Sequence, residues 1–286
     1  MSGVMFYTMA DGARFAQAHN FLAGVRPFLP HDGRLGLIDL GLTPDQVAIA
    51  VGDGIAVESF PDDRPAGEGG AADRFYRKYR AAEAWPLVER FLYCDCDCVF
   101  TRNGLAQWCQ RARFNDGLLV VNQPNSWFHL LRSHGIGDPL GLGGALYEPI
   151  VCASMFAATA GALKALDLLL REAREKAAAE GWTHWADEAG LMRVLHAAWR
   201  ARPFSVVKLP PIWHWHAGLG WSAQRQYLPI TDREAPTGPT EPATPFGDIV
   251  HCLHFGADGS EQHLAQCDAP LIPERYVTRK PDGLPI

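Results

Sequence analysis

Two carboxylates lie inside an otherwise apolar run in the segment Phe91-Leu92-Tyr93-Cys94-Asp95-Cys96-Asp97-Cys98-Val99-Phe100. We expect this segment to be a β-strand, in which side chains alternate between faces, so that Asp95 and Asp97 point to the same side. Two like charges on one face of a buried strand repel each other, but a divalent cation between the carboxylates cancels that charge. The segment therefore predicts a metal site near the end of a strand, with a solvated turn as the alternative interpretation.

Three cysteines, Cys94, Cys96 and Cys98, occupy alternate positions of the same segment. On a single strand they share the face opposite the aspartates. Structural zinc sites usually take pairs of cysteines or histidines from turns, so a row of cysteines along one strand is a poor match for zinc. We expect the three thiols to be reduced, free of metal and packed as small apolar groups under a helix.

The composition is that of a globular protein. Of the 286 residues, 48% are hydrophobic, which is enough for a packed core, and the net charge is −6. This charge argues against a general nucleic-acid binder, so we expect no nucleic-acid partner. Seven cysteines, an odd number, argue against a disulfide framework. The longest apolar region, residues 150–163, is too short for a membrane span, and with no export signal visible we expect a cytoplasmic protein.

Strands and helices are expected to alternate along the first hundred residues. The expected strands are residues 3–8, 34–42 and 55–60, and the expected helices are residues 13–29, a helix that starts at the Thr43-Pro44-Asp45-Gln46 capping box, and residues 73–89. This alternation predicts βαβ units and a mostly parallel sheet covered by helices on both faces. Ligands bind such sheets beyond the carboxyl ends of the strands, which is where Asp95 and Asp97 fall.

The second half of the chain continues the pattern and then changes character. We expect strands at residues 117–121, 150–157, 204–208 and 248–255, and helices at residues 159–179 and 186–200. Prolines recur every third residue from Pro236 to Pro245, which predicts an extended, poorly packed loop over residues 231–247. No linker divides the chain, so we expect one α/β domain over residues 1–258 and a C-terminal tail over residues 259–286.

In their order, these motifs resemble those of nucleotide-sugar-dependent glycosyltransferases of the GT-A fold that carry an Asp-x-Asp metal motif. The segments that carry the resemblance are residues 6–11, 38–46, 84–86, 91–97, 186–191 and 250–256. They span nearly the whole chain, and the Asp-x-Asp segment is the most specific of them. The resemblance implies a single Rossmann-like GT-A domain with a mixed, mostly parallel central sheet flanked by helices.

The resemblance also implies a set of functional residues, to which we add Lys78 from a local group of basic residues. They are Thr8, Asp11, Lys78 and Asp95 for the donor nucleotide, Asp95, Asp97, His251 and His254 for the metal, and Asp187 and Glu188 for catalysis or sugar orientation. The two acidic residues also suit a structural role, because negative charge is favourable at a helix N-terminus.

A histidine is expected to complete the metal site. His251 ends the part of the last expected strand that reaches the same edge as Asp97, so we rank it ahead of His254. His214 and His216 are the remaining alternatives.

The activity that the resemblance implies is transfer of a sugar from a nucleoside-diphosphate sugar to an acceptor, which is a glycan, a lipid or a small molecule. Mn²⁺ or Mg²⁺ at the diphosphate would stabilise the leaving group. Two other classes stay open. A nucleotidyltransferase is one, although residues 1–24 hold no Gly-rich loop for a triphosphate. A non-catalytic relative that only binds the nucleotide and metal is the other.

Overall fold

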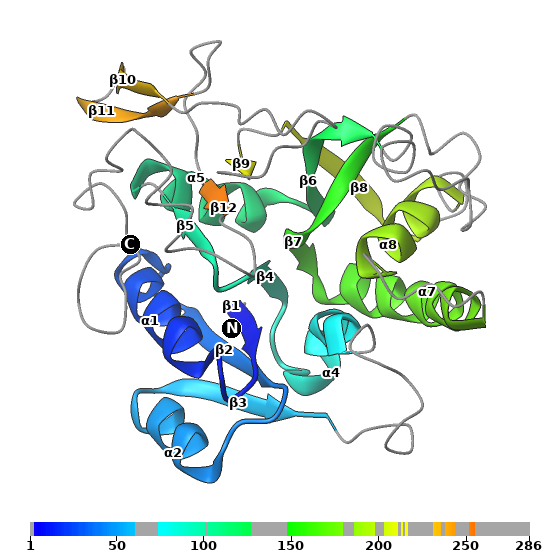
Figure 1. Ribbon diagram of the computed structural model, residues 1–286, viewed down its shortest axis with the longest axis horizontal. Coiled ribbons are helices and arrows are strands. Elements are labelled where there is room, and N and C mark those ends of the chain that lie inside the picture. The colour runs from blue at the N-terminus through cyan, green and yellow to red at the C-terminus, as the bar shows by residue number, and fades with distance from the viewer. Residues whose placement is uncertain are drawn as a thin grey trace.

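Seven strands form the central sheet of the computed structural model, in the order β3-β2-β1-β4-β7-β6-β8 (Figure 1). They are β1 (Val4–Ala10), β2 (Gly33–Asp39), β3 (Ile55–Ser59), β4 (Arg90–Cys94), β6 (Gly117–Ser126), β7 (Pro149–Thr159) and β8 (Ser205–Leu209). Only β7 runs against its neighbours β4 and β6, and every other pair in this sheet is parallel. The expected α/β class, with a mixed and mostly parallel sheet, is confirmed.

The structure describes most of the first 210 residues and only short segments after them. The described residues are 3–60, 74–100, 102–126, 148–179, 186–197, 203–210, 213, 215–216, 231–235, 238–243 and 252–254. Among the helices in these ranges, none combines the length and the apolar character that a membrane crossing needs.

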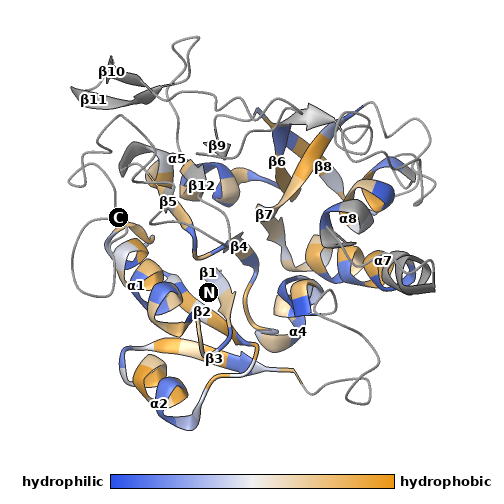
Figure 2. Ribbon diagram, in the orientation of Figure 1, coloured by the Kyte–Doolittle hydropathy of each residue, from blue (hydrophilic) through white to orange (hydrophobic). Residues whose placement is uncertain are grey.

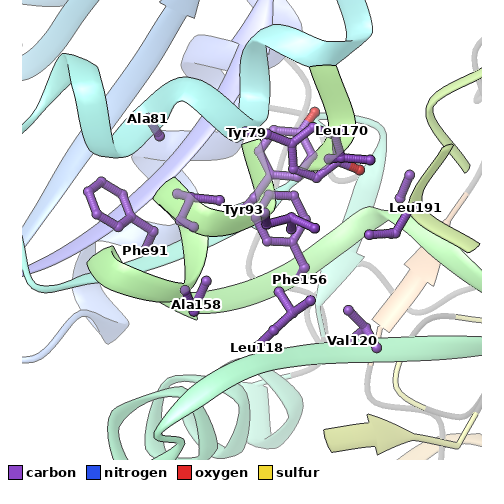
Figure 3. Packing of buried hydrophobic residues seen from close by; sticks show 14 of the residues in the cluster. Tyr79, Ala81, Phe91, Tyr93, Leu118, Val120, Phe156, Ala158, Leu170 and Leu191 are labelled. Atoms are coloured by element: carbon purple, nitrogen blue, oxygen red, sulfur yellow. The ribbon is translucent and has the colours of Figure 1, made fainter. Parts of the chain in front are cut away.

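Helices flank the sheet on both faces, and each face has its own hydrophobic layer (Figures 1 and 2). One layer takes side chains from α1 (Phe15–Val25), α2 (Pro44–Gly52) and α5 (Arg102–Phe114). The other takes them from the 3₁₀ helix η2 (Tyr76–Arg80), α4 (Ala81–Ala84), α7 (Ala160–Ala179) and α8 (Ala186–Ala197). In this second layer the rings of Tyr79 and Tyr93 stack on Phe156, at centroid distances of 5.2 and 5.1 Å (Figure 3).

A second, smaller sheet joins segments that lie far apart in the sequence. Its strands are β5 (Cys98–Phe100), β12 (Cys252–His254) and β9 (Trp215–His216). β12 pairs antiparallel with β5 and parallel with β9, so the C-terminal segment lies directly beside the strand that follows the two aspartates. A separate antiparallel hairpin, β10 (Thr231–Ala235) with β11 (Gly238–Ala243), occupies part of the proline-rich loop expected over residues 231–247.

The expected capping box is confirmed, and most expected elements are present with shifted ends. The amide of Gln46 donates to the hydroxyl of Thr43 at 3.3 Å, and the amide of Thr43 donates to the Gln46 side chain at 2.9 Å. The helix expected over residues 13–29 ends earlier, at Val25, and continues as the 3₁₀ helix η1 (Arg26–Phe28). Proline at position 27 explains the change, because it has no N–H to continue the α-helical hydrogen bonds.

One other expectation about helices is wrong, and one helix was not expected. Residues 73–89 do not form one helix, because α4 stops at Ala84 and Trp85 takes a non-helical conformation before Pro86. A residue that precedes proline is pushed out of the helical region by the proline ring. Helix α5 was not expected at all, although the buried Leu105, Trp108 and Ala112 follow the spacing of one helical face.

Candidate functional site

The two aspartates lie in a turn at the carboxyl end of β4. The strand stops at Cys94, and the amide of Asp95 then donates to the carbonyl of Ser154 in β7 at 2.8 Å. The amide of Cys98 closes the turn on the carbonyl of Asp95 at 3.2 Å, and β5 begins there. Asp95 is half-buried, and Asp97 is only 8% exposed.

This turn corrects the expectation of one continuous strand over residues 91–100. Asp95 and Asp97 do not share a face of a strand, and the alternation of the three cysteines is broken at the same place. Aspartate favours turns because its carboxylate accepts hydrogen bonds from nearby backbone amides, and two like charges disfavour a buried strand. The expected location, at the carboxyl end of a central strand, is nevertheless where the pair lies.

Tyr93 fixes one of the two carboxylates. Its hydroxyl donates a hydrogen bond to Oδ1 of Asp95. Burial raises the pKa of Tyr93 well above its usual value, and the negative charge of Asp95 raises it further, so the phenol remains a proton donor. The ring itself is held between Phe156 and Tyr7, with both centroid distances at 5.1 Å.

Lys78 lies behind this pair, inside the protein. Its side chain is almost fully buried, and Nζ is 5.2 Å from the ring centroid of Tyr93 and 5.5 Å from that of Tyr79. The hydroxyl of Tyr7 donates to the carbonyl of Lys78 at 2.6 Å and so fastens η2 to the sheet. A buried ammonium this close to two aromatic rings is favoured by the negative charge of their π faces.

The residues expected to contact the nucleotide from β1 lie nearby, in different environments. Thr8 is fully buried, and its hydroxyl forms no hydrogen bond with any described residue. Asp11 is half-buried and accepts a hydrogen bond from the amide of Arg14 at 3.1 Å, which closes the turn before α1. The buried hydroxyl of Thr8 can thus still donate and accept a hydrogen bond.

Glu188, at the start of α8, lies at the same edge of the sheet. β6 and β7 extend past the end of β4, and the amide of Gln123 in β6 donates to Oε1 of Glu188 at 2.9 Å. Gln123 is 1% exposed. Burial raises the pKa of Cys152 in β7, and the negative charge of Glu188 raises it further. Sequence reasoning did not find Gln123, because only the pairing of distant segments brings it to Glu188.

Three predicted site residues fall wholly or partly outside the described parts of the chain. The side chain of Asp187 and all of His251 lie outside them. For His254 the backbone is described, and β12 places it opposite Cys98 on one side and opposite His216 on the other. The ranking of His251 over His254 therefore stays a prediction.

The carboxylates of the turn suit a hard cation. Among the described residues, no third histidine, cysteine or carboxylate gathers with Asp95 and Asp97. Two carboxylates are nonetheless a common protein contribution to Mg²⁺, because substrate phosphates and water supply the remaining oxygens. Carboxylate oxygens of this kind are the ligands that Mg²⁺ and Mn²⁺ take in proteins.

A thiol cluster lies against the other side of the turn. The sulfur atoms of Cys94, Cys98 and Cys252 are within 4.8 Å of one another, and all three residues are buried. Burial raises the pKa of Cys94 and of Cys98 well above the usual value, and the thiols hydrogen-bond one another. Cys252 was not anticipated as a neighbour, since it lies 154 positions after Cys98 in the sequence.

Neither a protein-family model nor a curated protein matches the chain.

Proposed function

We propose that the protein is a metal-dependent glycosyltransferase that moves a sugar from a nucleoside-diphosphate sugar to a glycan, lipid or small-molecule acceptor. The observation that supports this most is the meeting of the Asp95–Asp97 turn and Glu188 at one edge of a mostly parallel sheet, with β7 between them. Such an edge is where α/β sheets bind their ligands. It offers one pair of carboxylates for a donor and a separate carboxylate for an acceptor.

The donor half of the proposal rests on the turn. Asp95 and Asp97 would hold Mn²⁺ or Mg²⁺ together with the diphosphate, and the cation would supply positive charge to the leaving phosphates. Asp97 is buried in a closed turn, and Asp95 is held by Tyr93. The carboxylate of Asp95 is therefore oriented before the donor arrives, so it needs little reorganisation on binding.

The acceptor half rests on Glu188. One of its oxygens accepts the hydrogen bond from Gln123, which fixes the orientation of the carboxylate. Glu188 is only half-buried, so part of its side chain reaches the surface. A carboxylate in this position can accept the proton of an acceptor hydroxyl or orient the transferred sugar. Asp187, its neighbour in the sequence, is the second acidic candidate.

Titration calorimetry with nucleoside diphosphates, in the presence and absence of Mn²⁺, tests the donor site. We expect binding that requires the cation and that weakens at least ~10-fold in Asp95→Asn and in Asp97→Asn. Asp45→Asn is the matched control, because Asp45 is an exposed carboxylate in the first turn of α2. Cation-dependent binding that is unchanged in both turn variants would remove the proposal.

Release of nucleoside diphosphate from a panel of nucleotide sugars then separates the remaining classes. A glycosyltransferase should turn over at least one donor, with slow hydrolysis when no acceptor is present. A protein that binds tightly but releases no product from any donor is a binding module. Formation of a nucleotide sugar from a nucleoside triphosphate would identify a nucleotidyltransferase instead.

A further inference from the structure

The thiol cluster of Cys94, Cys98 and Cys252 is separate from the machinery assigned to sugar transfer. It draws its members from the end of β4, the start of β5 and the C-terminal strand β12. The three sulfur atoms lie within 4.8 Å of one another in the interior. Apolar side chains could surround each thiol separately in this layer. The close approach of three thiols therefore needs an explanation other than packing.

The local geometry of the first two cysteines is that of a metal-binding turn. Three residues separate Cys94 from Cys98, and the chain between them turns, with the amide of Cys98 donating to the carbonyl of Asp95. Structural zinc sites take pairs of cysteines at this spacing from turns, together with a second group of ligands further along the chain. Cys252 supplies that second group. Cysteines along one straight strand are a poor match for zinc, whereas Cys94 and Cys98 lie on either side of a turn.

The distances also fit. A zinc–sulfur bond of about 2.3 Å places neighbouring sulfur atoms of a tetrahedral site roughly 3.8 Å apart. Sulfur atoms already within 4.8 Å of one another are thus about 1 Å or less from that spacing. Thiolate ligands also favour zinc over Mg²⁺ and Mn²⁺, so this cluster and the carboxylates of the turn would select different metals.

We propose that Cys94, Cys98 and Cys252 supply three of the four ligands of one structural zinc ion, which joins the C-terminal strand to the aspartate turn. Each thiol gives one proton to solvent as its sulfur binds the metal. A zinc ion at this position would stabilise the small sheet, because its strands are only two or three residues long. Strands this short hold their register weakly through hydrogen bonds alone.

Metal analysis of the full chain tests the proposal. The protein is purified without chelators and without a metal-affinity step, and its zinc is counted by mass spectrometry. We expect about one zinc per chain in the wild type and less than about a tenth of that in Cys252→Ala and in Cys98→Ala. Cys96→Ala is the matched control. Cys96 lies between Cys94 and Cys98 in the sequence and is buried, but it is not part of the cluster. It should keep its zinc.

Two further measurements keep the test decisive if a cysteine variant fails to fold. Cobalt added to reduced, metal-free wild-type protein should give the near-ultraviolet charge-transfer absorption of thiolate ligands. Asp97→Asn should retain its zinc, which separates this site from the proposed donor site. The proposal is overturned if the wild type holds no zinc and shows no thiolate–cobalt band. It is equally overturned if zinc is lost from Asp97→Asn and retained in Cys252→Ala.

Discussion

The hydroxyl of Tyr93 donates a hydrogen bond to Oδ1 of Asp95, across the point where β4 ends and the turn begins. The ring of Tyr93 is locked in the aromatic layer by Phe156, with an interplanar angle of 25° (Figure 3). The orientation of a candidate metal ligand is therefore set by the hydrophobic core. A residue that orients a ligand in this way affects metal affinity without touching the metal.

Replacing Tyr93 with phenylalanine should weaken cation-dependent nucleotide binding by roughly 10- to 100-fold, because Asp95 loses the group that orients it. Calorimetry with Mn²⁺ and a nucleoside diphosphate measures the change. Tyr79→Phe is the control, since it removes a buried hydroxyl from the same layer and leaves the bond to Asp95 in place. Equal affinities in the wild type and Tyr93→Phe would show that the hydrogen bond does not position the carboxylate.

Glu188→Gln should separate catalysis from donor binding. The new amide oxygen can still accept the hydrogen bond from Gln123, so the local geometry is kept while the proton acceptor is lost. We expect sugar transfer to fall by about 10²-fold or more, with the nucleotide Kd nearly unchanged. Glu172→Gln, on the exposed side of α7, is the control. If transfer is unaffected in Glu188→Gln, then Asp187 is the remaining acidic candidate.

Local patterns in the sequence were sufficient to predict strands of the central sheet and the capped helix. Alternation of apolar segments located β1, β2 and β3, and the Thr43–Gln46 box located the start of α2. These features depend on residues that are close in sequence, so short-range rules apply. The same rules placed the aspartates at a sheet edge but made the whole of residues 91–100 a strand. A turn was the alternative interpretation, but the hydrogen bond from the amide of Asp95 to the carbonyl of Ser154 in β7, which favours it over a strand, is not contained in any local pattern.

The rest of the candidate site depends on contacts between distant segments. The bond from Gln123 to Glu188 joins residues 65 positions apart, and the contact of Cys252 with Cys98 requires the pairing of β12 with β5. Periodicity cannot reveal such pairs, because each partner is unremarkable in its own neighbourhood. The missed helix α5 is different, since the spacing of Leu105, Trp108 and Ala112 could have predicted it.

Tyr7→Phe should destabilise the fold by about 1–3 kcal/mol at pH 7, because the buried carbonyl of Lys78 loses its donor. Burial raises the pKa of Tyr7 well above its usual value of 10.0, so the unfolded chain releases this proton first as the pH rises. The contribution of Tyr7 is therefore fully present below about pH 10 and is lost above it. Urea unfolding at neutral and alkaline pH should show the difference between the two proteins narrowing as the pH rises. A constant difference would contradict this assignment.

Gly190→Ala should disturb the packing of α8, the helix that carries Glu188, against η2. A Cβ at this position would lie 2.7 Å from the hydroxyl oxygen of Tyr76 and 3.5 Å from its ring, so the clash is with the hydroxyl alone. Overpacking of this kind costs roughly 1–3 kcal/mol of unfolding free energy. Tyr76→Phe removes the clashing oxygen, and the double variant should recover most of the loss that Gly190→Ala causes. A double-mutant cycle from urea unfolding measures this coupling, and it allows for the separate cost of Tyr76→Phe. Simple additivity of the two changes would mean that α8 packs against η2 in another way, and the position of Glu188 would then need revision.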